Sequence, residues 1–297
     1  MSKAFDCLPH DVLIEKMKHY KFSKNSLSLI EDYLSNRFQR VKIQSTVSVW
    51  ERLTKGVPQG SIVGPLCFNL YVNDLLLLLE SKDLLPSNYA DDNTVTVAGN
   101  TKNAVIEKVT STVSLLASWF KDNQMKANID KFQLMVLSPC VRELQTEVTI
   151  QVDDVCITSQ SSAKLLGINI DSDLRFDKHV KSLCNKSNAK VQILKRIAQY
   201  LSVDCRLAIV RSFIISQFVY CSILFLFCRR FYSDRMDKIV YRAPKVVLSD
   251  YSSPYEELLT RSNLKNLEIQ RQKSLLCEIY KSINDIGPTY MRDIFMI

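Results

Sequence analysis

The chain has 297 residues, of which 46% are hydrophobic and 24% are charged. This length can bury one large core or two modest ones, and the composition is that of an ordinary soluble protein without a low-complexity tract. The formal net charge of +8 favours an anionic partner such as nucleic acid. The nine cysteines show no C-x-x-C spacing, so we expect reduced thiols in an intracellular protein of the nucleus or cytoplasm rather than a secreted disulfide scaffold or a zinc site.

The first quarter of the chain is predicted to combine two helices with a hairpin. Apolar residues recur at helical spacing over residues 8–35. Over residues 39–50, valine and isoleucine alternate with polar residues, which predicts a β-hairpin. A loop rich in glycine and proline follows over residues 56–65, and residues 66–79 read as a buried helix.

The most informative pattern is a pair of adjacent carboxylates. An apolar stretch leads into Tyr89, Ala90, Asp91 and Asp92, and residues 94–97 then alternate threonine with valine, which predicts strand, tight turn, strand. Neighbouring strand residues point to opposite faces, so only a turn lets both carboxylates converge on one cation. Paired carboxylates suit Mg²⁺, and two bridged Mg²⁺ ions drive in-line phosphoryl transfer. Taken alone, such a pair is more often part of a solvated loop.

Beyond the carboxylate pair the chain changes from mixed to helical character. The expected elements are an amphipathic helix over 104–120, strands over 132–137 and 165–170, a small hairpin over 148–157, and basic helices over 178–196 and 264–283. We therefore predict two domains, 1–170 and 171–297. The apolar stretch 213–228 is shorter than the roughly 20 residues that a membrane-spanning helix needs, so we expect a buried helix there and no membrane partner.

The loop at residues 56–66 is the second informative motif. Its three glycines and two prolines allow a close, fixed approach of the backbone to a ligand. Gln59 can donate and accept hydrogen bonds, and a helix that begins near Leu66 leaves free N–H groups for an anion. A purely structural loop that feeds a helix is an equal alternative.

Together these motifs resemble the reverse transcriptase domain of non-LTR (LINE-type) retrotransposons, and the jockey-like group most closely. The matching segments occur in family order: 2–6, 34–41, 56–66, 89–92, 119–131, 164–168, 177–180 and 216–221. The resemblance covers nearly the whole chain. It implies an α+β fold in which a right-hand palm, with a central antiparallel sheet backed by helices, precedes a helical thumb.

The resemblance also implies the chemistry of the carboxylate pair. Asp91 and Asp92 would hold two Mg²⁺ ions, with Asp91 the stronger ligand candidate, in an RNA-directed DNA polymerase that uses an RNA template, a DNA primer and deoxynucleotides. Lys131 would lie near the triphosphate as a possible acid for the pyrophosphate leaving group. A plain surface lysine is the alternative for Lys131.

Further residues would bind the nucleotide and the template. Tyr89 and Ala90 belong to the catalytic hairpin, and Gln59 and Gly60 would line the incoming nucleotide and the template base. Phe5 resembles the bulky residue that packs against the sugar and excludes a 2′-hydroxyl, with a core aromatic as the alternative. The basic helices after residue 172 resemble a thumb that grips the backbone of a duplex, with a solvated helix face as the alternative.

One departure from the family pattern concerns the start of the chain. The first catalytic aspartate of the family lies three residues before the position that Lys3 occupies, which falls ahead of Met1. We therefore expect the third metal-binding carboxylate and the fingers subdomain to be missing, and little or no activity from the chain as it stands. The alternative function is a non-catalytic, nucleic-acid-binding remnant of such an element.

Overall fold

The computed structural model describes residues 5–82, 84–128, 131–138, 147–152, 155–226 and 228–295. These residues fall into two compact units. The first unit runs to Leu134 and includes Glu147–Ser159, and the second includes Met135–Thr146 and Gln160–Ile297. The main change of unit therefore follows Ser159, ahead of the predicted boundary at residue 170.

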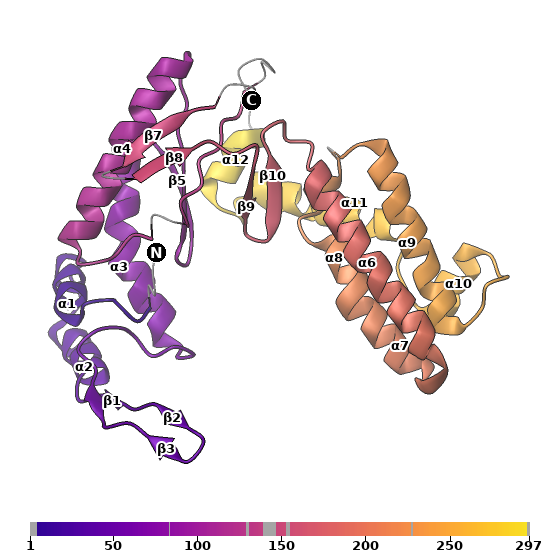
Figure 1. Ribbon diagram of the computed structural model, residues 1–297, viewed down its shortest axis with the longest axis horizontal. Coiled ribbons are helices and arrows are strands. Elements are labelled where there is room, and N and C mark those ends of the chain that lie inside the picture. Colours follow the sequence, from indigo (N-terminus) through magenta and orange to yellow (C-terminus); the bar gives the residue numbers. More distant parts are fainter. Residues whose placement is uncertain are drawn as a thin grey trace. The chain divides into compact units, whose positions relative to one another are not determined.

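The first unit opens with the two predicted helices, α1 (His10–His19) and α2 (Lys24–Leu34) (Figure 1). The hydroxyl of Ser23 accepts a hydrogen bond from the backbone N–H of Ser26, which caps α2 at its first turn. Helix α1 packs against both α2 and the long helix α3 (Val63–Glu80). Its apolar face is buried in the core of this unit, which confirms the helical prediction for residues 8–35.

Helix α3 (Val63–Glu80) supplies the two largest fully buried side chains of that core, Tyr71 and Phe68. Phe68, Tyr71 and Leu75 are fully buried and recur at helical spacing on one face. Within the described residues, α3 is also the one helix whose length and apolar composition would suffice to cross a membrane, although 39% of its residues are buried inside the protein. The helix begins at Val63, three residues ahead of the predicted start.

Apart from α1, α2 and α3, the first unit is built from one more helix and short hairpins. The remaining elements are β1 (Phe38–Gln39), β2 (Lys42–Ile43), β3 (Thr46–Val47), β4 (Glu51–Arg52), β5 (Leu85–Tyr89), β6 (Asp92–Thr96), α4 (Lys102–Asp122), β7 (Thr149–Val152) and β8 (Val155–Thr158). In the described part of this unit β1 pairs with β4, β2 with β3, β5 with β6 and β7 with β8, and all four pairs are antiparallel. The predicted hairpins over 39–50 and 148–157 and the helix over 104–120 are confirmed.

Two expectations about strands in this unit are wrong. The described residues form only two-stranded sheets, so the expected central antiparallel sheet is not formed among them. The segment around Phe5 is hydrogen-bonded to the glycine loop and not to a strand. The N–H of Val57 donates to the carbonyl of Phe5 at 2.8 Å, and the N–H of Gly56 donates to the carbonyl of Leu8 at 2.7 Å. Residues 132–137 are not a strand either, since only Leu134 makes an isolated bridge, to Ser159.

The second unit begins with a hairpin, β9 (Ser162–Leu165) and β10 (Ile168–Asp171), followed by helices. The helical elements are α6 (Asp177–Ile197), η2 (Ala198–Tyr200), α7 (Val203–Val210), η3 (Arg211–Ile215), α8 (Ser216–Val219), η4 (Ser222–Leu226), α9 (Arg230–Leu248), α10 (Tyr255–Ser262), α11 (Leu267–Ile283) and α12 (Thr289–Phe295). Helices α6 and α9 pack along each other over the second core (Figure 1). Both predicted basic helices, over 178–196 and 264–283, are confirmed.

Two further predictions fail in this unit. Residues 165–170 are not one strand, because the chain turns at Leu166 and Gly167, whose φ angles are 46° and 86°. The apolar stretch 213–228 is not one buried helix. It passes from a π-helix into a short α-helix and then a 3₁₀-helix, with Cys221 in the left-handed region at φ 49° as the break.

Candidate functional site

The adjacent carboxylates lie at the turn of the β5–β6 hairpin, as the alternation of the sequence predicts. Tyr89 pairs with Asp92, so Ala90 and Asp91 form the two-residue connection. Ala90 has a φ of 51°, a conformation that a residue with a Cβ adopts only at a cost. Asp91 is half-buried, whereas Asp92 and Tyr89 are exposed. The turn thus places two consecutive aspartates at the tip of the hairpin, one half-buried and one exposed.

The inner face of the same hairpin holds a polar pair that the sequence analysis missed. Asn88 lies opposite Asn93, on the face that also carries Val95, and Val95 packs against the core of the first unit. Within the described residues, both amide atoms of Asn88 and the amide oxygen of Asn93 are buried without a hydrogen-bond partner. The available signal was the strand alternation, which sets both asparagines on the same face as Val95.

The glycine loop wraps around the segment of Phe5. Gln59 donates a hydrogen bond from Nε2 to Oδ1 of Asp6 at 2.7 Å. Gly56 has a φ of 84°, and a Cβ placed there would lie 2.8 Å from the Cα of Asp6, so only glycine permits this approach. His10 fixes the loop from the other side by bonding its Nε2 to the carbonyl of Gly56 at 2.7 Å.

The exposed end of the loop leads directly into α3. The hydroxyl of Ser61 accepts from the N–H of Gly64 at 2.9 Å and donates to the carbonyl of Pro58 at 2.7 Å. Gly60 has a φ of 81°, and a Cβ there would meet nothing within 4 Å. Gln59 and Gly60 are both exposed, so the surface that the sequence analysis assigned to a nucleotide is accessible.

Phe5 and Lys131 lie in contrasting surroundings. Phe5 is half-buried and stacks on Phe68, with ring centroids 4.7 Å apart and an angle of 27° between the planes. This contact anchors the ring to the core of the first unit. Lys131 is exposed, and its backbone N–H donates to the carbonyl of Asn128 at 3.1 Å.

The chemistry of the hairpin tip fits a divalent cation in part. Asp91 and Asp92 offer hard oxygen ligands of the kind that Mg²⁺ takes. Among the residues that the structure describes, no group of three or more histidine, cysteine, aspartate or glutamate side chains gathers at a possible metal site. Asp91 and Asp92 are therefore two consecutive carboxylates without a third side chain of these types grouped with them in the described part of the chain.

Comparison with known proteins decides the family. Residues 1–170, more than half of the chain, match the family model described as "Reverse transcriptase (RNA-dependent DNA polymerase)". The chain belongs to the reverse transcriptase family. Proteins of this family generally use divalent metal ions. The matched region contains the glycine loop and the Asp91–Asp92 turn.

Similar reverse transcriptases come from non-LTR retrotransposons of insects. The chain is 30% identical over 205 residues to the "Probable RNA-directed DNA polymerase from transposon BS" of Drosophila melanogaster, a match that covers 66% of this chain and 22% of the relative. It is 27% identical over 192 residues to the corresponding protein of the X-element, covering 64% and 21%. It is 22% identical over 220 residues to the "RNA-directed DNA polymerase from mobile element jockey", covering 71% and 24%. The matches thus span about a fifth to a quarter of these relatives.

Helix α6 of the second unit carries the basic side chains that the sequence analysis assigned to a thumb. Its buried face includes Val180, Leu183 and Val191, and Lys181 and Lys186 are exposed. Not all of these basic side chains are free to contact a partner, because the half-buried Lys190 donates from Nζ to the carbonyl of Phe213 at 3.0 Å. Lys195 also has a partner, since its Nζ lies 5.2 Å from the ring centroid of Tyr251.

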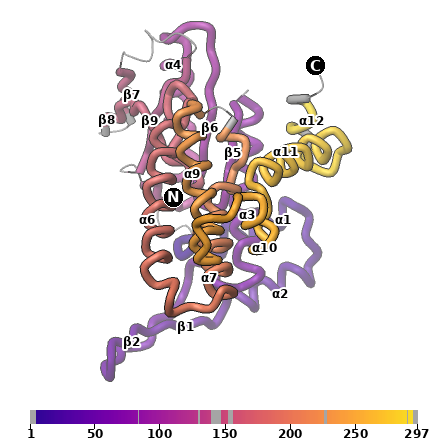
Figure 2. The backbone as a smooth tube through the Cα atoms, turned by 90° about the vertical axis from the view of Figure 1, so that its right-hand side faces the viewer, coloured from indigo at the N-terminus to yellow at the C-terminus, as the bar shows by residue number. Residues whose placement is uncertain are grey.

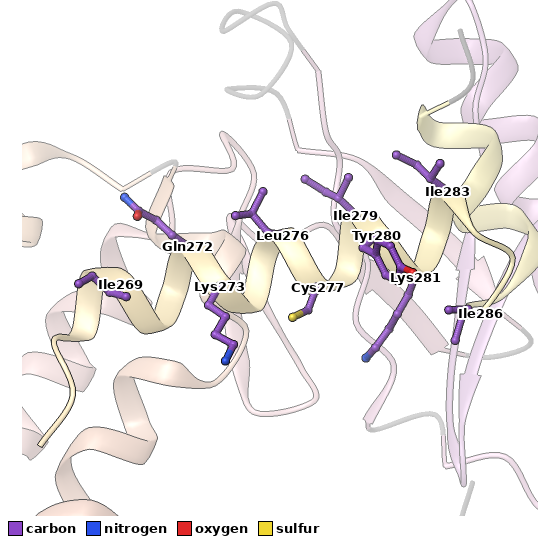
Figure 3. Close-up of a pocket in the computed structure, with 10 residues that line it drawn as sticks. All are labelled: Ile269, Gln272, Lys273, Leu276, Cys277, Ile279, Tyr280, Lys281, Ile283 and Ile286. Carbon is purple, nitrogen blue, oxygen red and sulfur yellow. The ribbon is translucent and has the colours of Figure 1, made fainter. Parts of the chain in front are cut away.

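The second unit also has an apolar groove along α11 (Figure 3). Ile269, Leu276 and Ile283 recur every seven residues on this face, and each is at least half exposed. Among the described residues that line the groove there is no carboxylate.

Proposed function

We propose that the first unit is part of the palm of an RNA-directed DNA polymerase, which extends a DNA primer on an RNA template. The observation that carries the proposal is the strained two-residue turn that brings Asp91 and Asp92 to an accessible hairpin tip. The family membership and the retrotransposon relatives support the same reaction class.

In this proposal Asp91 and Asp92 hold divalent cations, with Mg²⁺ as the expected ion. When bound, such ions stabilise the charge that develops on the attacking and leaving oxygens during nucleotidyl transfer. The hairpin would position these ligands, because its tight turn fixes the backbone of the two consecutive aspartates before substrate arrives. Because the described residues bring no third side chain of this kind to the pair, the proposed site needs a further ligand.

The glycine loop would place the incoming deoxynucleotide and the template base. Gln59 and Gly60 present an exposed backbone and an amide side chain next to the segment of Phe5, which Gln59 reaches through Asp6. Phe5 would contact the sugar while its stacking on Phe68 keeps the ring in place. Lys131, exposed on the same unit, would donate a proton to the leaving pyrophosphate.

The second unit would serve as a thumb that contacts the phosphate backbone of the template–primer duplex. Basic residues of α6 and α9 support this assignment, because cationic side chains bind a polyanion without reading its sequence. A non-catalytic binder of nucleic acid is the second candidate function. It is favoured by the finding that the described residues bring no third metal ligand to the two aspartates.

Primer extension on an RNA template with Mg²⁺ and deoxynucleotides tests the polymerase proposal. The chain is assayed alone and fused behind the region that precedes the matched segment in the transposon BS relative. We expect no extension by the chain alone above an Asp91→Asn variant, and extension by the fusion that falls about a hundredfold or more with Asp91→Asn or Asp92→Asn.

Asp32→Asn is the matched control, because it removes an exposed carboxylate from α2 in the same unit. It should leave extension unchanged. Equal extension by the wild-type and Asp91→Asn fusions would reject the proposed catalytic role. Mn²⁺ provides a second readout, since bound Mn²⁺ should broaden the amide NMR signals of residues 89–93 before those of α2. Duplex binding without such broadening or extension would favour the non-catalytic alternative.

A further inference from the structure

Residues 38–52 form a β-hairpin arm that projects from the first unit beyond α2 (Figures 1 and 2). At its base β1 pairs with β4, and nearer its tip β2 pairs with β3. Each ladder is only two residues long on each strand. All fifteen residues of the arm are exposed.

The arm buries too little apolar surface within the first unit to explain why it is folded as a hairpin. None of its side chains joins the hydrophobic core of the first unit. An isolated two-stranded hairpin is marginally stable in water, because it has no second layer against which to pack. Its larger apolar side chains are 44% to 75% exposed: Phe38, Val41, Ile43, Val47, Val49 and Trp50. Six large apolar side chains exposed on one projecting element indicate a surface that binds a partner.

The charge of the arm favours a polyanionic partner. Arg40, Lys42 and Arg52 carry three positive charges, against the single negative charge of Glu51. The polar tip disfavours insertion into a membrane, because the turn is made by Gln44 and Ser45. A hairpin that enters a bilayer would place apolar residues at that point.

Arg40 and Trp50 form the chemically most specific feature of the arm. The guanidinium carbon of Arg40 lies 4.5 Å from the centroid of the Trp50 ring, while the Trp50 side chain remains 60% exposed. The cation holds one aromatic surface next to a positive charge. An unpaired base can stack on an exposed ring of this kind while a guanidinium contacts the adjoining phosphate. Bases inside a duplex are already stacked on each other and are not available for such contact.

We propose that the arm is a binding site for single-stranded nucleic acid, with Trp50 stacking on a base and Arg40 and Lys42 contacting phosphates. This site lies outside the Asp91–Asp92 hairpin and the glycine loop, and its binding function requires no catalysis. Through the arm, the first unit would bind unpaired template or displaced strand in addition to any contact at the Asp91–Asp92 hairpin. RNA and DNA single strands share the chemistry that the arm recognises.

Tryptophan fluorescence makes the proposal directly testable. The chain has two tryptophans, of which Trp119 is 6% exposed and Trp50 is 60% exposed. Titration of the full chain with oligouridine and, separately, oligothymidine should quench the exposed Trp50 emission, and the two titrations distinguish RNA from DNA. Anisotropy of labelled oligonucleotides should show binding weakened about fivefold to a hundredfold by Trp50→Ala, whereas Trp50→Phe retains most of the affinity.

Charge variants separate the phosphate contacts from stacking. Arg40→Ala with Lys42→Ala should make the slope of log affinity against log salt shallower by about 1.4, since each phosphate contact on a single strand contributes about 0.7. Lys18→Ala with Lys24→Ala removes two exposed cations from α1 and α2 and should change affinity and slope less. Replacement of residues 40–50 by Asn-Gly should weaken oligonucleotide binding in the anisotropy assay at least as much as Trp50→Ala does, while circular dichroism shows that the protein is folded.

Three results would overturn the proposal. The first is a Trp50→Ala variant that binds both oligonucleotides with an affinity within twofold of wild type. The second is quenching of Trp50 by anionic phospholipid vesicles but not by oligonucleotides. The third is burial of Trp50 by self-association of the chain in the absence of nucleic acid. The two proposals fail in different ways. Failure of the polymerase proposal would appear as a fusion whose extension is absent or does not depend on Asp91, while oligonucleotides still quench Trp50 in the chain.

Discussion

Asn88 lies directly opposite Asn93 across the β5–β6 hairpin, one residue pair behind the Tyr89–Asp92 pair that closes it. Within the described residues, three of their four side-chain amide atoms are buried without a hydrogen-bond partner. An unsatisfied buried polar group costs about 1–3 kcal/mol. The hairpin that carries the two aspartates is therefore less stable than an apolar inner face would make it, a pattern that is common where function constrains sequence.

Replacing both asparagines should stabilise the protein. Asn88→Val with Asn93→Val removes both unsatisfied amides and places β-branched residues in paired strands, so we expect the free energy of unfolding to rise by about 1–3 kcal/mol. Denaturant unfolding measures the change. Ser87→Val with Thr94→Val, the adjacent pair on the other face, is the matched control and should change stability by less than about 0.5 kcal/mol. A less stable asparagine double variant would show that these amides do have partners in solution.

The two glycines of the 56–60 loop should respond differently to alanine. Both have a φ above 80°, but a Cβ at Gly56 would lie 2.8 Å from the Cα of Asp6 and a Cβ at Gly60 would meet nothing within 4 Å. Gly60→Ala should cost about 1 kcal/mol from backbone strain alone. Gly56→Ala adds a backbone clash and should cost at least about 2 kcal/mol. Thermal unfolding of the two variants side by side gives the comparison, and equal losses would contradict the close approach to Asp6.

The sequence predicted those parts of the site that depend on local pattern. The Asp91–Asp92 turn is local, because the alternation on either side of it specifies two strands and only a turn can join them. The bond from Gln59 to Asp6 spans 53 residues and could not be read from either segment. The unsatisfied amides of Asn88 and Asn93 depend on what packs over the hairpin, which strand alternation alone does not reveal.

The wrong predictions of the fold have similar causes. Leu166 adopts a φ of 46°, which is uncommon for a residue other than glycine, asparagine or aspartate, so residues 165–170 look like one strand rather than a turn. The stretch 213–228 is apolar almost throughout and offers no periodicity that would reveal the break at Cys221. In both places tertiary packing overrides the local signal. Tyr220, for example, donates from its hydroxyl to the carbonyl of Leu166 at 2.8 Å and so fixes the turn.

The stability of the second unit should depend on pH through Asp250. The carboxylate accepts hydrogen bonds from the backbone N–H groups of Ser252 and Ser253, from the Ser253 hydroxyl and from Arg261, and these hold the pKa of Asp250 well below its ordinary value. Because the folded-state pKa is depressed, the contribution to stability is present above the unfolded-state pKa and is lost as the pH falls below about 4.

Asp250→Asn should therefore lower the melting temperature at neutral pH and change it less at pH 2–3. Melting curves of wild type and variant between pH 2 and 7 measure the difference. Asp204→Asn, in the first turn of α7, removes one carboxylate from the same unit as the control. If the difference in melting temperature between wild type and Asp250→Asn is constant across the pH range, the proposed linkage is contradicted.

Binding of an RNA–DNA hybrid by α6 should depend on the exposed cations and not on Lys190. Lys181, Lys186 and Arg196 are exposed, whereas the half-buried Lys190 donates to the carbonyl of Phe213. Replacing the three exposed cations by alanine should weaken hybrid binding and make the slope of log affinity against log salt shallower by up to about 2.7, since each phosphate contact on a duplex contributes about 0.9.

Lys190→Ala separates binding from stability in the same helix. Loss of its hydrogen bond to Phe213 should lower the free energy of unfolding by about 1 kcal/mol and leave the salt slope within about 0.3 of wild type. Titrations between low and physiological salt, with circular dichroism to verify folding, compare the two variants. An unchanged slope in the triple variant would mean that α6 presents a solvated face, and the proposal that the second unit grips duplex backbone would then be wrong.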